Sequence, residues 1–388
     1  MLSWKSAPRN GLTAEKMTKP TNDERAPVLL FEHATSSGQV LAEAHLNVEA
    51  TLNSLSLDMI DIIHPALDEW AGRSDVVAVL FTGAGDRAFC AGGDIQALYH
   101  AMVRNHDQGE VVDEYPFEFF EREYRFDYRI HTYPKPVIAV GHGVVMGGGL
   151  GILSAARYRV VTERSRIAMP EVTIGLFPDA GQTWLLRNMP RHHATFLGVT
   201  GSHMNGADAL AVGLGTHGVA IAARTEVRDL LCSAEWGGDA DEAVGAALAQ
   251  LTPGEFPDSQ VQHIPESLGT EGELGTVVAA IEALQGTSDW IDRGIAAMQG
   301  GCPTTVGIVV EQLKRAGAMQ LADTFRLEMT VATHCANNHD FAEGVRALLI
   351  EKDNAPSWQF GDLASLPSAY VESHFVEPWP QNPLADLG

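Results

Sequence analysis

A short apolar run followed by three consecutive glycines places the strongest constraint on how this chain can fold. Val137 to Val140 is short, rich in β-branched residues and bounded by chain-breaking residues, which is typical of a buried strand. Gly147 to Gly149 then precede a second apolar stretch, which predicts a helix that begins at the glycines. The first N–H groups of a helix have no partner within it, and together with the helix dipole they favour an oxygen that is gaining negative charge. This stretch therefore predicts an oxyanion hole.

Two carboxylates follow in an apolar segment that is rich in turn-forming residues. Glu171 lies within Met169 to Gly175, and Asp179 follows Leu176 to Pro178. A carboxyl group against an apolar wall has a raised pKa, so it can act as a base or proton carrier near neutral pH. The alternative is structural, with Glu171 starting a helix after Pro170 and Asp179 capping the next turn. The glycine triplet nearby favours the acid–base interpretation.

A second glycine motif, AFCAGGD, spans Ala88 to Asp94. Gly92 and Gly93 allow the backbone to approach a ligand, and Asp94 lies at the N-terminal end of a helix expected to begin at Ile95. Taken alone, each glycine motif is also explained by a tight strand-to-helix turn that binds nothing.

Three motifs occur in a fixed order: AFCAGGD, MGGG from Met146 to Gly149, and PEVTIGLFPDAG from Pro170 to Gly181. Their combination resembles the crotonase, or enoyl-CoA hydratase/isomerase, superfamily, and within it most closely the 3-hydroxyisobutyryl-CoA hydrolases. Further segments carry the same resemblance, namely FFEREY at 119–124, GLFPD at 175–179 and HDFAEGVRALLIEKDNAPSW at 339–358. The resemblance covers residues 28 to 360, approximately.

The resemblance implies a site made of backbone N–H groups and carboxylates. It puts the two oxyanion-hole donors at Ala91 and Gly148, where they would stabilise a thioester oxygen in the transition state by about 3 kcal/mol per donor. It puts the catalytic carboxylates at Glu171 and Asp179. Contacts to the substrate are implied for Glu123, Gly147, Gly92, Gly93 and Asp94.

Gly151 separates this chain from the hydratases of the superfamily. Those enzymes carry two glutamates, because adding water across a double bond needs a base for the water and a proton for the carbon. The first of the two positions falls on Gly151 here, whereas Glu171 fills the second. The function implied is hydrolysis of a short β-hydroxyacyl-CoA thioester, with 3-hydroxyisobutyryl-CoA from valine breakdown as the expected substrate. Two alternatives stay open: an enoyl-CoA hydratase or isomerase that uses one glutamate, and a non-catalytic acyl-CoA-binding protein.

The formal charge of −24 restricts the expected partners. It argues against non-specific binding to nucleic acid or to anionic membranes, which both need a basic surface. An acyl-CoA partner is also anionic, so its site must supply local Arg or Lys side chains. Arg87 is a candidate, although an ordinary solvated arginine explains it equally well. The resemblance implies no metal and no redox cofactor, and it allows a homo-oligomer because superfamily members often form trimers.

The four cysteines form neither a zinc-binding motif nor a disulfide framework, which fits a reducing compartment. No apolar run reaches the length of a membrane span, and the first residues lack the apolar core of a signal peptide. Residues 1–25 mix acidic and basic side chains and are expected to form a polar tail. We therefore expect a cytoplasmic location, with the mitochondrial matrix as the alternative.

The fold class implied is α/β: a crotonase-like spiral of ββα units over residues 26–200, followed by a helical C-terminal region over 201–360. Residues 237–275 are rich in Gly, Asp, Glu and Pro, which indicates an insertion with a helix and loops. Residues 361–388 contain several prolines and are expected to be loosely packed. Near the N-terminus, Ser54 or Ser56 should cap a helix that reaches Trp70, and Pro65 should bend or interrupt that helix.

Overall fold

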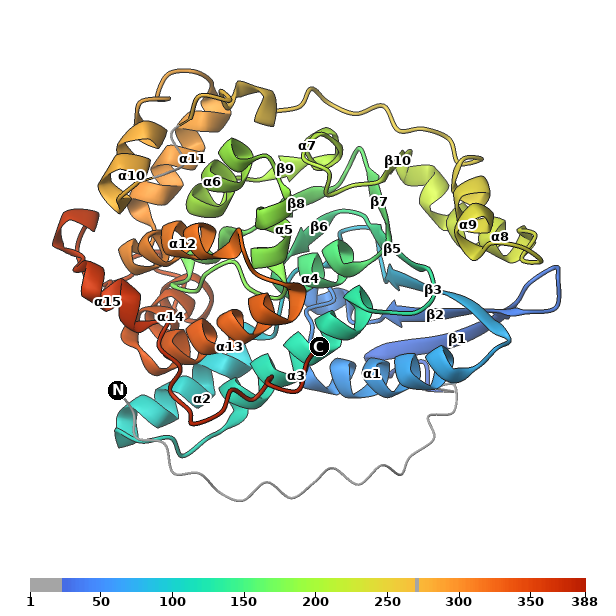
Figure 1. Ribbon diagram of the computed structural model, residues 1–388, viewed down its shortest axis with the longest axis horizontal. Helices are drawn as coiled ribbons and strands as arrows, with labels where there is room; N and C mark the ends of the chain where they lie inside the picture. Colours follow the sequence, from blue (N-terminus) through green and yellow to red (C-terminus); the bar gives the residue numbers. More distant parts are fainter. Residues whose placement is uncertain (1–22, 269–271) are drawn as a thin grey trace.

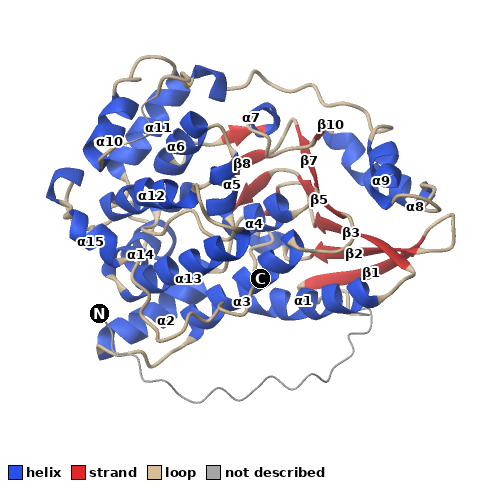
Figure 2. Ribbon diagram, viewed as in Figure 1, coloured by secondary structure: helices blue, strands red, loops and turns tan. Residues whose placement is uncertain are grey.

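Two β-sheets form the centre of the fold (Figures 1 and 2). The computed structural model describes residues 23–268 and 272–388. Its strands are β1 (Val28–Ala34), β2 (Val40–Leu46), β3 (Val76–Gly83), β4 (Ala88–Cys90), β5 (Val137–Gly141), β6 (Val144–Met146), β7 (Tyr158–Thr162), β8 (Arg166–Ala168), β9 (Met204–Asn205) and β10 (His217–Val219). The six-stranded sheet has the order β1-β2-β3-β5-β7-β10, and the four-stranded sheet has the order β4-β6-β8-β9.

Three consecutive strand pairs build both sheets in the same way. β3, β5 and β7 lie parallel in the larger sheet, and β4, β6 and β8, which follow each of them, lie parallel in the smaller one. A helical segment comes after each pair: α2 (Ile95–Gln108), α4 (Gly147–Ala155) and the 3-10 turn η2 (Pro170–Thr173). This arrangement confirms the predicted spiral of ββα units. Because parallel strands end at the same edge, the three predicted site motifs meet there.

Helices make up most of the remaining described chain. They are α1 (Leu57–Gly72), α3 (Tyr115–His131), α5 (Gln182–Asn188), α6 (Arg191–Thr200), α7 (Gly206–Ala211), α8 (Glu226–Ser233), α9 (Ala240–Leu248), α10 (Leu274–Glu282), α11 (Asp289–Gly300), α12 (Pro303–Ala316), α13 (Leu321–Asn337), α14 (His339–Val345) and α15 (Ser368–Ser373). Short 3-10 turns are η1 (Glu49–Thr51), η3 (Ile221–Thr225), η4 (Val261–His263) and η6 (Leu363–Ser365), and η5 (Arg346–Ile350) is a π-helix. Figure 2 shows the six-stranded sheet on one side of α4 and helices α10 to α15 on the other.

Helix α1 corrects one prediction and confirms another. The Ser56 side chain accepts a hydrogen bond from the backbone N–H of Met59, so Ser56 is the predicted cap. The helix continues through Pro65, so the interruption that was one of the two expected effects of this proline does not occur. An internal proline costs about 3 kcal/mol, but Ile63 and Leu67 on either side of it are fully buried in the core and hold the helix in place.

The larger sheet is covered on both faces, which explains why its parallel strands are almost continuously apolar. One face, with Val79, Phe81 and Ala139, packs against the main core that includes α1, α3 and α4. The opposite face, with Leu80 and Ile138, packs against a second core that includes α8 and α9. The site described below lies on the side of the main core.

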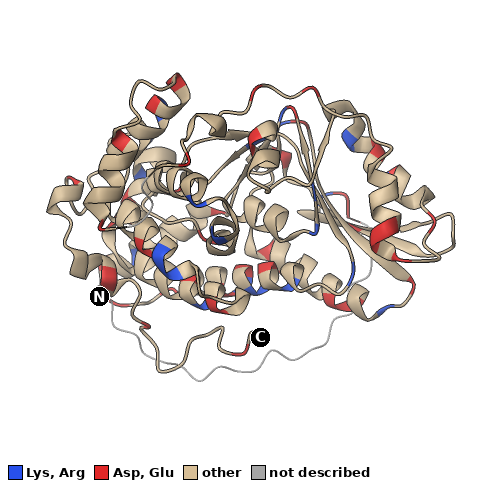
Figure 3. Cartoon of the chain, turned by 45° about the horizontal axis from the view of Figure 1, so that its top comes forward, with Lys and Arg blue, Asp and Glu red and all other residues tan. Residues whose placement is uncertain are grey.

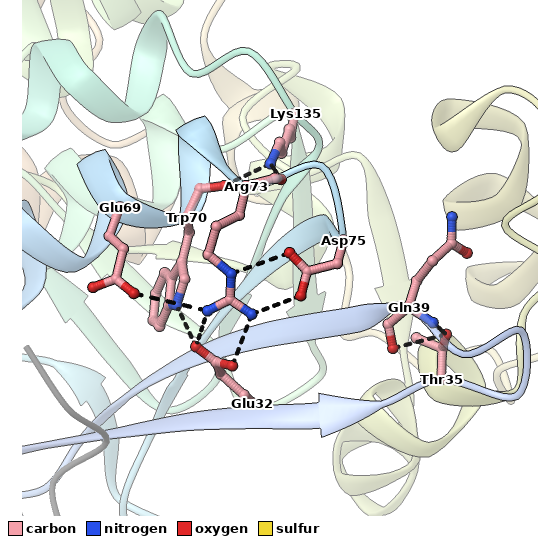
Figure 4. Close-up of polar contacts among 8 residues, drawn as sticks. All are labelled: Glu32, Thr35, Gln39, Glu69, Trp70, Arg73, Asp75 and Lys135. Atoms are coloured by element: carbon pink, nitrogen blue, oxygen red, sulfur yellow. Dashed lines mark hydrogen bonds and ion pairs between the residues drawn. The ribbon is translucent and has the colours of Figure 1, made fainter.

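A network of charged and polar groups fastens the end of α1 to the larger sheet (Figure 4). The guanidinium of Arg73 bonds the carboxylates of Glu32 on β1 and Asp75 just before β3. The indole N–H of Trp70 donates to Glu32 at 3.1 Å, and the ammonium of Lys135 donates to the carbonyl oxygens of Trp70 and Arg73. These contacts fix the end of α1 relative to the strand that leads to AFCAGGD.

The C-terminal segment differs from the loosely packed tail that was expected. Leu384 is completely buried, and Val371 on α15 is 7% exposed. The guanidinium of Arg125 on α3 pairs with Asp386 at 2.8 Å. Val371, Leu384 and the ion pair of Asp386 therefore anchor this segment to the rest of the protein.

Two further predictions concern the ends of the chain and the insertion. The predicted polar tail, 1–25, lies almost wholly outside the described residues. The segment 237–275 contains α9 and η4 in its described part. In the part of the chain that the structure describes, no helix has the length and apolar character needed to cross a membrane.

Candidate active site

Helix α4 begins at the glycine triplet, near the middle of the molecule in Figure 1. Its N-cap residue, Met146, makes no capping hydrogen bond through its side chain, so the first N–H groups of the helix have no side-chain acceptor there. A Cβ added to Gly149 would overlap the carbonyl oxygen of Cys90, and one added to Gly148 would overlap Oε1 of Glu123. The glycines therefore allow a backbone turn and a carboxyl group to meet at the same helix end.

The structure corrects the first oxyanion donor. The backbone N–H of Ala91 already donates to the carbonyl oxygen of Leu52 at 3.1 Å, so it is not available to a ligand. The two neighbours of Gly93 are hydrogen-bonded to Leu55, at 2.7 and 2.9 Å, in a parallel bridge. The residue between two such bonds turns its own N–H to the opposite side. Gly93 is partly exposed and its N–H has no acceptor among the described residues, so Gly93 and Gly148 are the candidate donors.

The other predicted residues of the two glycine motifs lie at the same edge. Gly92 has a φ of +118° and Gly147 a φ of +46°, which are conformations that favour glycine. A Cβ added to Gly147 would lie 3.2 Å from the Cα of Gly92, so the two motifs are in contact. Asp94 caps α2 by accepting a hydrogen bond from the N–H of Ala97 at 3.2 Å.

Glu171 is a buried carboxyl group without a full set of partners. It is the second residue of η2, directly after Pro170, and is 3% exposed. Its Oε2 atom has no hydrogen-bond partner in the described part of the chain. Burial raises the pKa of Glu171 well above its usual range, the nearby Asp179 raises it further, and the side chain of Gln182 acts in the opposite direction. Such a group can take up a proton near neutral pH.

Asp179 lies in the turn before α5 and is 4% exposed. The hydroxyl of Tyr124 on α3 donates to its Oδ2 at 2.6 Å. Burial raises the pKa of Asp179 to about 7, although the hydrogen bond from Tyr124 lowers it. The turn itself has left-handed residues at Ala180 and Gly181, with φ of 53° and 81°.

Glu328 on α13 completes this turn and was not predicted from the sequence. Its two carboxyl oxygens accept hydrogen bonds from the backbone N–H groups of Gly181 at 2.8 Å and Thr183 at 2.9 Å. It is fully buried, and burial raises its pKa to about 8. Glu328 thereby holds the backbone that carries Asp179.

Two acidic residues of α3 face the same region. Glu123, predicted from FFEREY, is 3% exposed, and its Oε1 has no partner in the described chain. Asp127, which was not predicted, is completely buried, and neither of its carboxyl oxygens has a partner among the described residues. Burial raises the pKa of both. Repulsion from Asp179 and Glu328 raises the pKa of Glu123 further, and repulsion from Glu123, Glu328 and Asp179 does the same for Asp127. The site thus collects five buried carboxyl groups.

Arg87 stands apart from this cluster. It is exposed, and its side chain makes no hydrogen bond or ion pair with the described residues. Figure 3 shows Asp and Glu spread over many elements of the chain. Arg87 directly precedes β4, whereas Gly92 and Gly93 follow the other end of that strand. A cavity of about 460 Å³ on the opposite face of the larger sheet, bordered by Glu43, His45 and Arg228, contains none of the predicted site residues. No metal-binding group of three or more His, Cys, Asp or Glu side chains occurs within residues 23–268 and 272–388.

Comparisons with known proteins agree with this geometry. The family model described as enoyl-CoA hydratase/isomerase matches residues 41–375. The chain is 32% identical to "3-hydroxyisobutyryl-CoA hydrolase, mitochondrial" of Gallus gallus over 94% of this chain and 96% of that protein. Among solved structures, a carnitinyl-CoA dehydratase from Mycobacterium thermoresistibile is 30% identical with a TM-score of 0.79, covering 92% of this chain and 98% of that one. An enoyl-CoA hydratase from Rhodobacter sphaeroides 2.4.1 is 29% identical with a TM-score of 0.76, covering 91% and 98%.

Proposed function

Because the chain belongs to the enoyl-CoA hydratase/isomerase family, we propose that it hydrolyses a short β-hydroxyacyl-CoA thioester, with 3-hydroxyisobutyryl-CoA as the first candidate. The observation that carries the proposal is the set of carboxyl groups. Glu171 and Asp179 are both buried, and the negative charge of Asp179 raises the pKa of Glu171, whereas position 151 carries glycine. The Gallus gallus relative, which is named as a 3-hydroxyisobutyryl-CoA hydrolase, supports the same substrate class.

The proposed mechanism uses the backbone first. The N–H groups of Gly93 and Gly148 would hold the thioester oxygen and stabilise the negative charge that develops there. Glu171 would then either take a proton from an attacking water or attack the carbonyl carbon itself to give a short-lived anhydride. In both versions the C–S bond breaks, and the sulfur leaves as CoA thiol with a proton that comes from water. In the second version water then hydrolyses the anhydride, which releases the acyl group as the acid and regenerates the Glu171 carboxylate.

Asp179 and Glu123 would bind the β-hydroxyl of the substrate. Their buried carboxyl groups can donate or accept a hydrogen bond depending on protonation, and Asp179, with a pKa of about 7, changes between these states near neutral pH. A hydroxyl would satisfy polar atoms such as Oε1 of Glu123 that have no partner among the described residues. This is the physical basis for preferring a β-hydroxyacyl group.

An enoyl-CoA hydratase or isomerase with a single glutamate is the second candidate, because the two similar solved structures are those of a carnitinyl-CoA dehydratase and an enoyl-CoA hydratase. The packing at Gly151 argues against a conventional two-glutamate site. A Cβ there would lie 2.9 Å from Oδ2 of Asp127 and 2.9 Å from the carbonyl oxygen of Ala180. A non-catalytic acyl-CoA-binding protein is the third candidate, and buried carboxyl groups that cost stability argue against it.

The test follows free thiol and enoyl absorbance together on a panel of short acyl-CoA thioesters. Thiol release from 3-hydroxyisobutyryl-CoA without enoyl loss is the expected result, and enoyl loss without thiol release would make the protein a hydratase or isomerase. Glu171→Gln should abolish turnover while CoA still binds. Glu118→Gln, on the exposed side of α3, is the matched control and should keep full activity.

The proposal includes the surroundings of the reaction. Arg87 would contact a phosphate of CoA. Coenzyme A would be part of the substrate, and the reaction would need no metal or redox cofactor. The word "mitochondrial" in the name of the Gallus gallus relative supports the mitochondrial matrix, the alternative to a cytoplasmic location. A homo-oligomer stays an expectation from the resemblance.

A further inference from the structure

Helix α3 carries three titratable residues at four-residue spacing: Glu123, Asp127 and His131. Residues four apart lie on the same face of a helix, with Cβ atoms about 5–6 Å apart. Each of the three has a buried polar atom without a hydrogen-bond partner among the described residues, namely Oε1 of Glu123, both carboxyl oxygens of Asp127 and Nε2 of His131. Buried polar atoms are usually hydrogen-bonded, so three successive residues with unpaired polar atoms on one helix face call for an explanation.

The row follows a defined path through the protein. Glu123 lies against Gly148 at the start of α4, and Asp127 lies against Gly151, one turn further along α4. A Cβ added to Gly181 would lie 3.2 Å from Nε2 of His131, so the row then passes the turn that follows Asp179. His131 is the last residue of α3, and the next residue in the chain is exposed. The row therefore leads from the oxyanion end of the site to the end of α3.

The charges around the row suit proton transfer. Glu123 and Asp127 are faced by two further acids, Asp179 and Glu328, and burial together with this repulsion raises their pKa values, which favours the protonated form of each. Burial lowers the pKa of His131 to about 4, with a smaller contribution from Arg159, so its ring is neutral at pH 7. A protonated carboxyl group and a neutral imidazole can each donate and accept a proton.

Resting on the hydrolysis proposed above, we propose that Glu123, Asp127 and His131 form a proton path that carries the proton released by each turnover to the C-terminal end of α3. The balance of the reaction leaves one proton to be removed in each turnover. Water supplies its hydroxyl to the carbonyl carbon and one proton to the leaving thiolate, and the acid product then ionises and releases one proton into a site of buried carboxyl groups. Transfer between neighbours occurs directly or through one bridging water. No oxidant or reductant takes part.

The test uses Asp127→Asn, which keeps the size of the side chain but cannot pass a proton. Thiol release from 3-hydroxyisobutyryl-CoA should show kcat about tenfold lower, a KM within twofold of the unsubstituted protein and an unchanged Tm. Raising the imidazole buffer concentration should restore kcat in the variant, because a small proton carrier can enter through the substrate opening, and should not affect the unsubstituted protein. His131→Phe interrupts the other end of the row and should give the same buffer-dependent loss.

Several results would overturn the proton path. They are an unchanged kcat in both variants, a loss that imidazole does not restore, or a loss accompanied by a higher KM and a lower Tm, which would assign Asp127 and His131 to packing. Thiol release by the unsubstituted protein tests the hydrolase proposal separately. If that protein releases no thiol, the hydrolase function and the path both fail; if it does and the variants match it, only the path fails. Glu118→Gln on the exposed face of α3 is the control variant.

Discussion

Replacing Tyr124 by phenylalanine should move the pH dependence of hydrolysis to higher pH. The Tyr124 hydroxyl donates to Oδ2 of Asp179 at 2.6 Å and lowers the pKa of Asp179, which burial raises to about 7. A hydrogen bond to a charged group contributes about 1.5–3 kcal/mol, and one pKa unit corresponds to about 1.4 kcal/mol. Loss of the bond should therefore raise the pKa of Asp179 by about one to two units. If the reaction needs the Asp179 carboxylate, the rising part of the pH–rate profile should shift from near pH 7 by the same amount, and the rate at pH 7 should fall about tenfold.

The assay is thiol release at saturating substrate between about pH 5.5 and 9.5. Phenylalanine keeps the aromatic packing of Tyr124, whose ring centroid lies 5.8 Å from that of Phe120 and 6.2 Å from that of Phe325. Tyr128→Phe is the matched control, because Tyr128 lies on the same helix and contacts Phe325, and it should leave the profile in place. A profile of Tyr124→Phe that keeps its midpoint near pH 7 while its plateau falls would refute the role of Asp179 ionisation.

Three further predictions concern the buried carboxyl groups, the packing of Gly148 and the exposed side chain of Arg87. The free energy of unfolding should fall as the pH rises from about 5 to 8. Burial raises the pKa of Asp179 to about 7 and that of Glu328 to about 8 in the folded state, so in this range the folded state holds protons that the unfolded state has lost. A higher urea midpoint at pH 8 than at pH 5 would contradict this. Gly148→Ala should lower kcat/KM about a hundredfold by displacing the adjacent carboxyl group and disturbing an oxyanion donor, whereas Gly245→Ala, in open space on α9, should have no effect on the measured rate. Arg87→Ala should raise KM about tenfold for an acyl-CoA but not for the same acyl group on pantetheine, and an equal change for both would argue against a phosphate contact.

Local sequence signals predicted the parts of the fold that are local in origin. The strand before the glycine triplet, the helix that begins at Gly147 and the cap at Asp94 all depend on residues within one turn, and all three are present. The alternation of strand, turn and helix likewise indicated the ββα units. These features are set by backbone conformation and capping, which neighbouring residues control.

The first oxyanion donor depends instead on strand register. AFCAGGD contains three adjacent residues whose N–H groups could face a ligand, and only pairing with another segment decides which one does. That segment is Leu52 to Leu55, which bonds the N–H of Ala91 and both neighbours of Gly93. Because adjacent residues of a strand face opposite directions, the identity of the donor changes with every one-residue shift. The motif alone could not select Gly93.

The two acids that were not predicted, Asp127 and Glu328, did leave a signal in the phase of their helices. On α3, Glu123 and Asp127 fall among the buried positions, four and eight residues after Phe119, whereas Glu118 on the same helix is exposed and pairs with Arg122. Acidic residues are rarely buried without a partner. An acidic residue at a helix position that the apolar periodicity places in the core is therefore a stronger indication of function than the presence of an acidic residue alone.

The same phase argument applies to α13, where Glu328 lies beside the buried Phe325 and Met329. Helical phase cannot say, however, that α3 and α13 pack against each other, nor that both face the turn between Asp179 and Thr183. The tertiary fold brings these helices and the turn together, and this makes one site of the separate buried acids. The neighbouring acids raise the pKa values of Glu123 and Asp127 beyond the effect of burial. Glu328→Gln removes the negative charge of Glu328 and should therefore lower the pKa of Asp127 and of Glu123. The pKa values can be measured by titrating the carboxyl groups with infrared spectroscopy. If neither pKa falls, burial alone sets the protonation of these two groups.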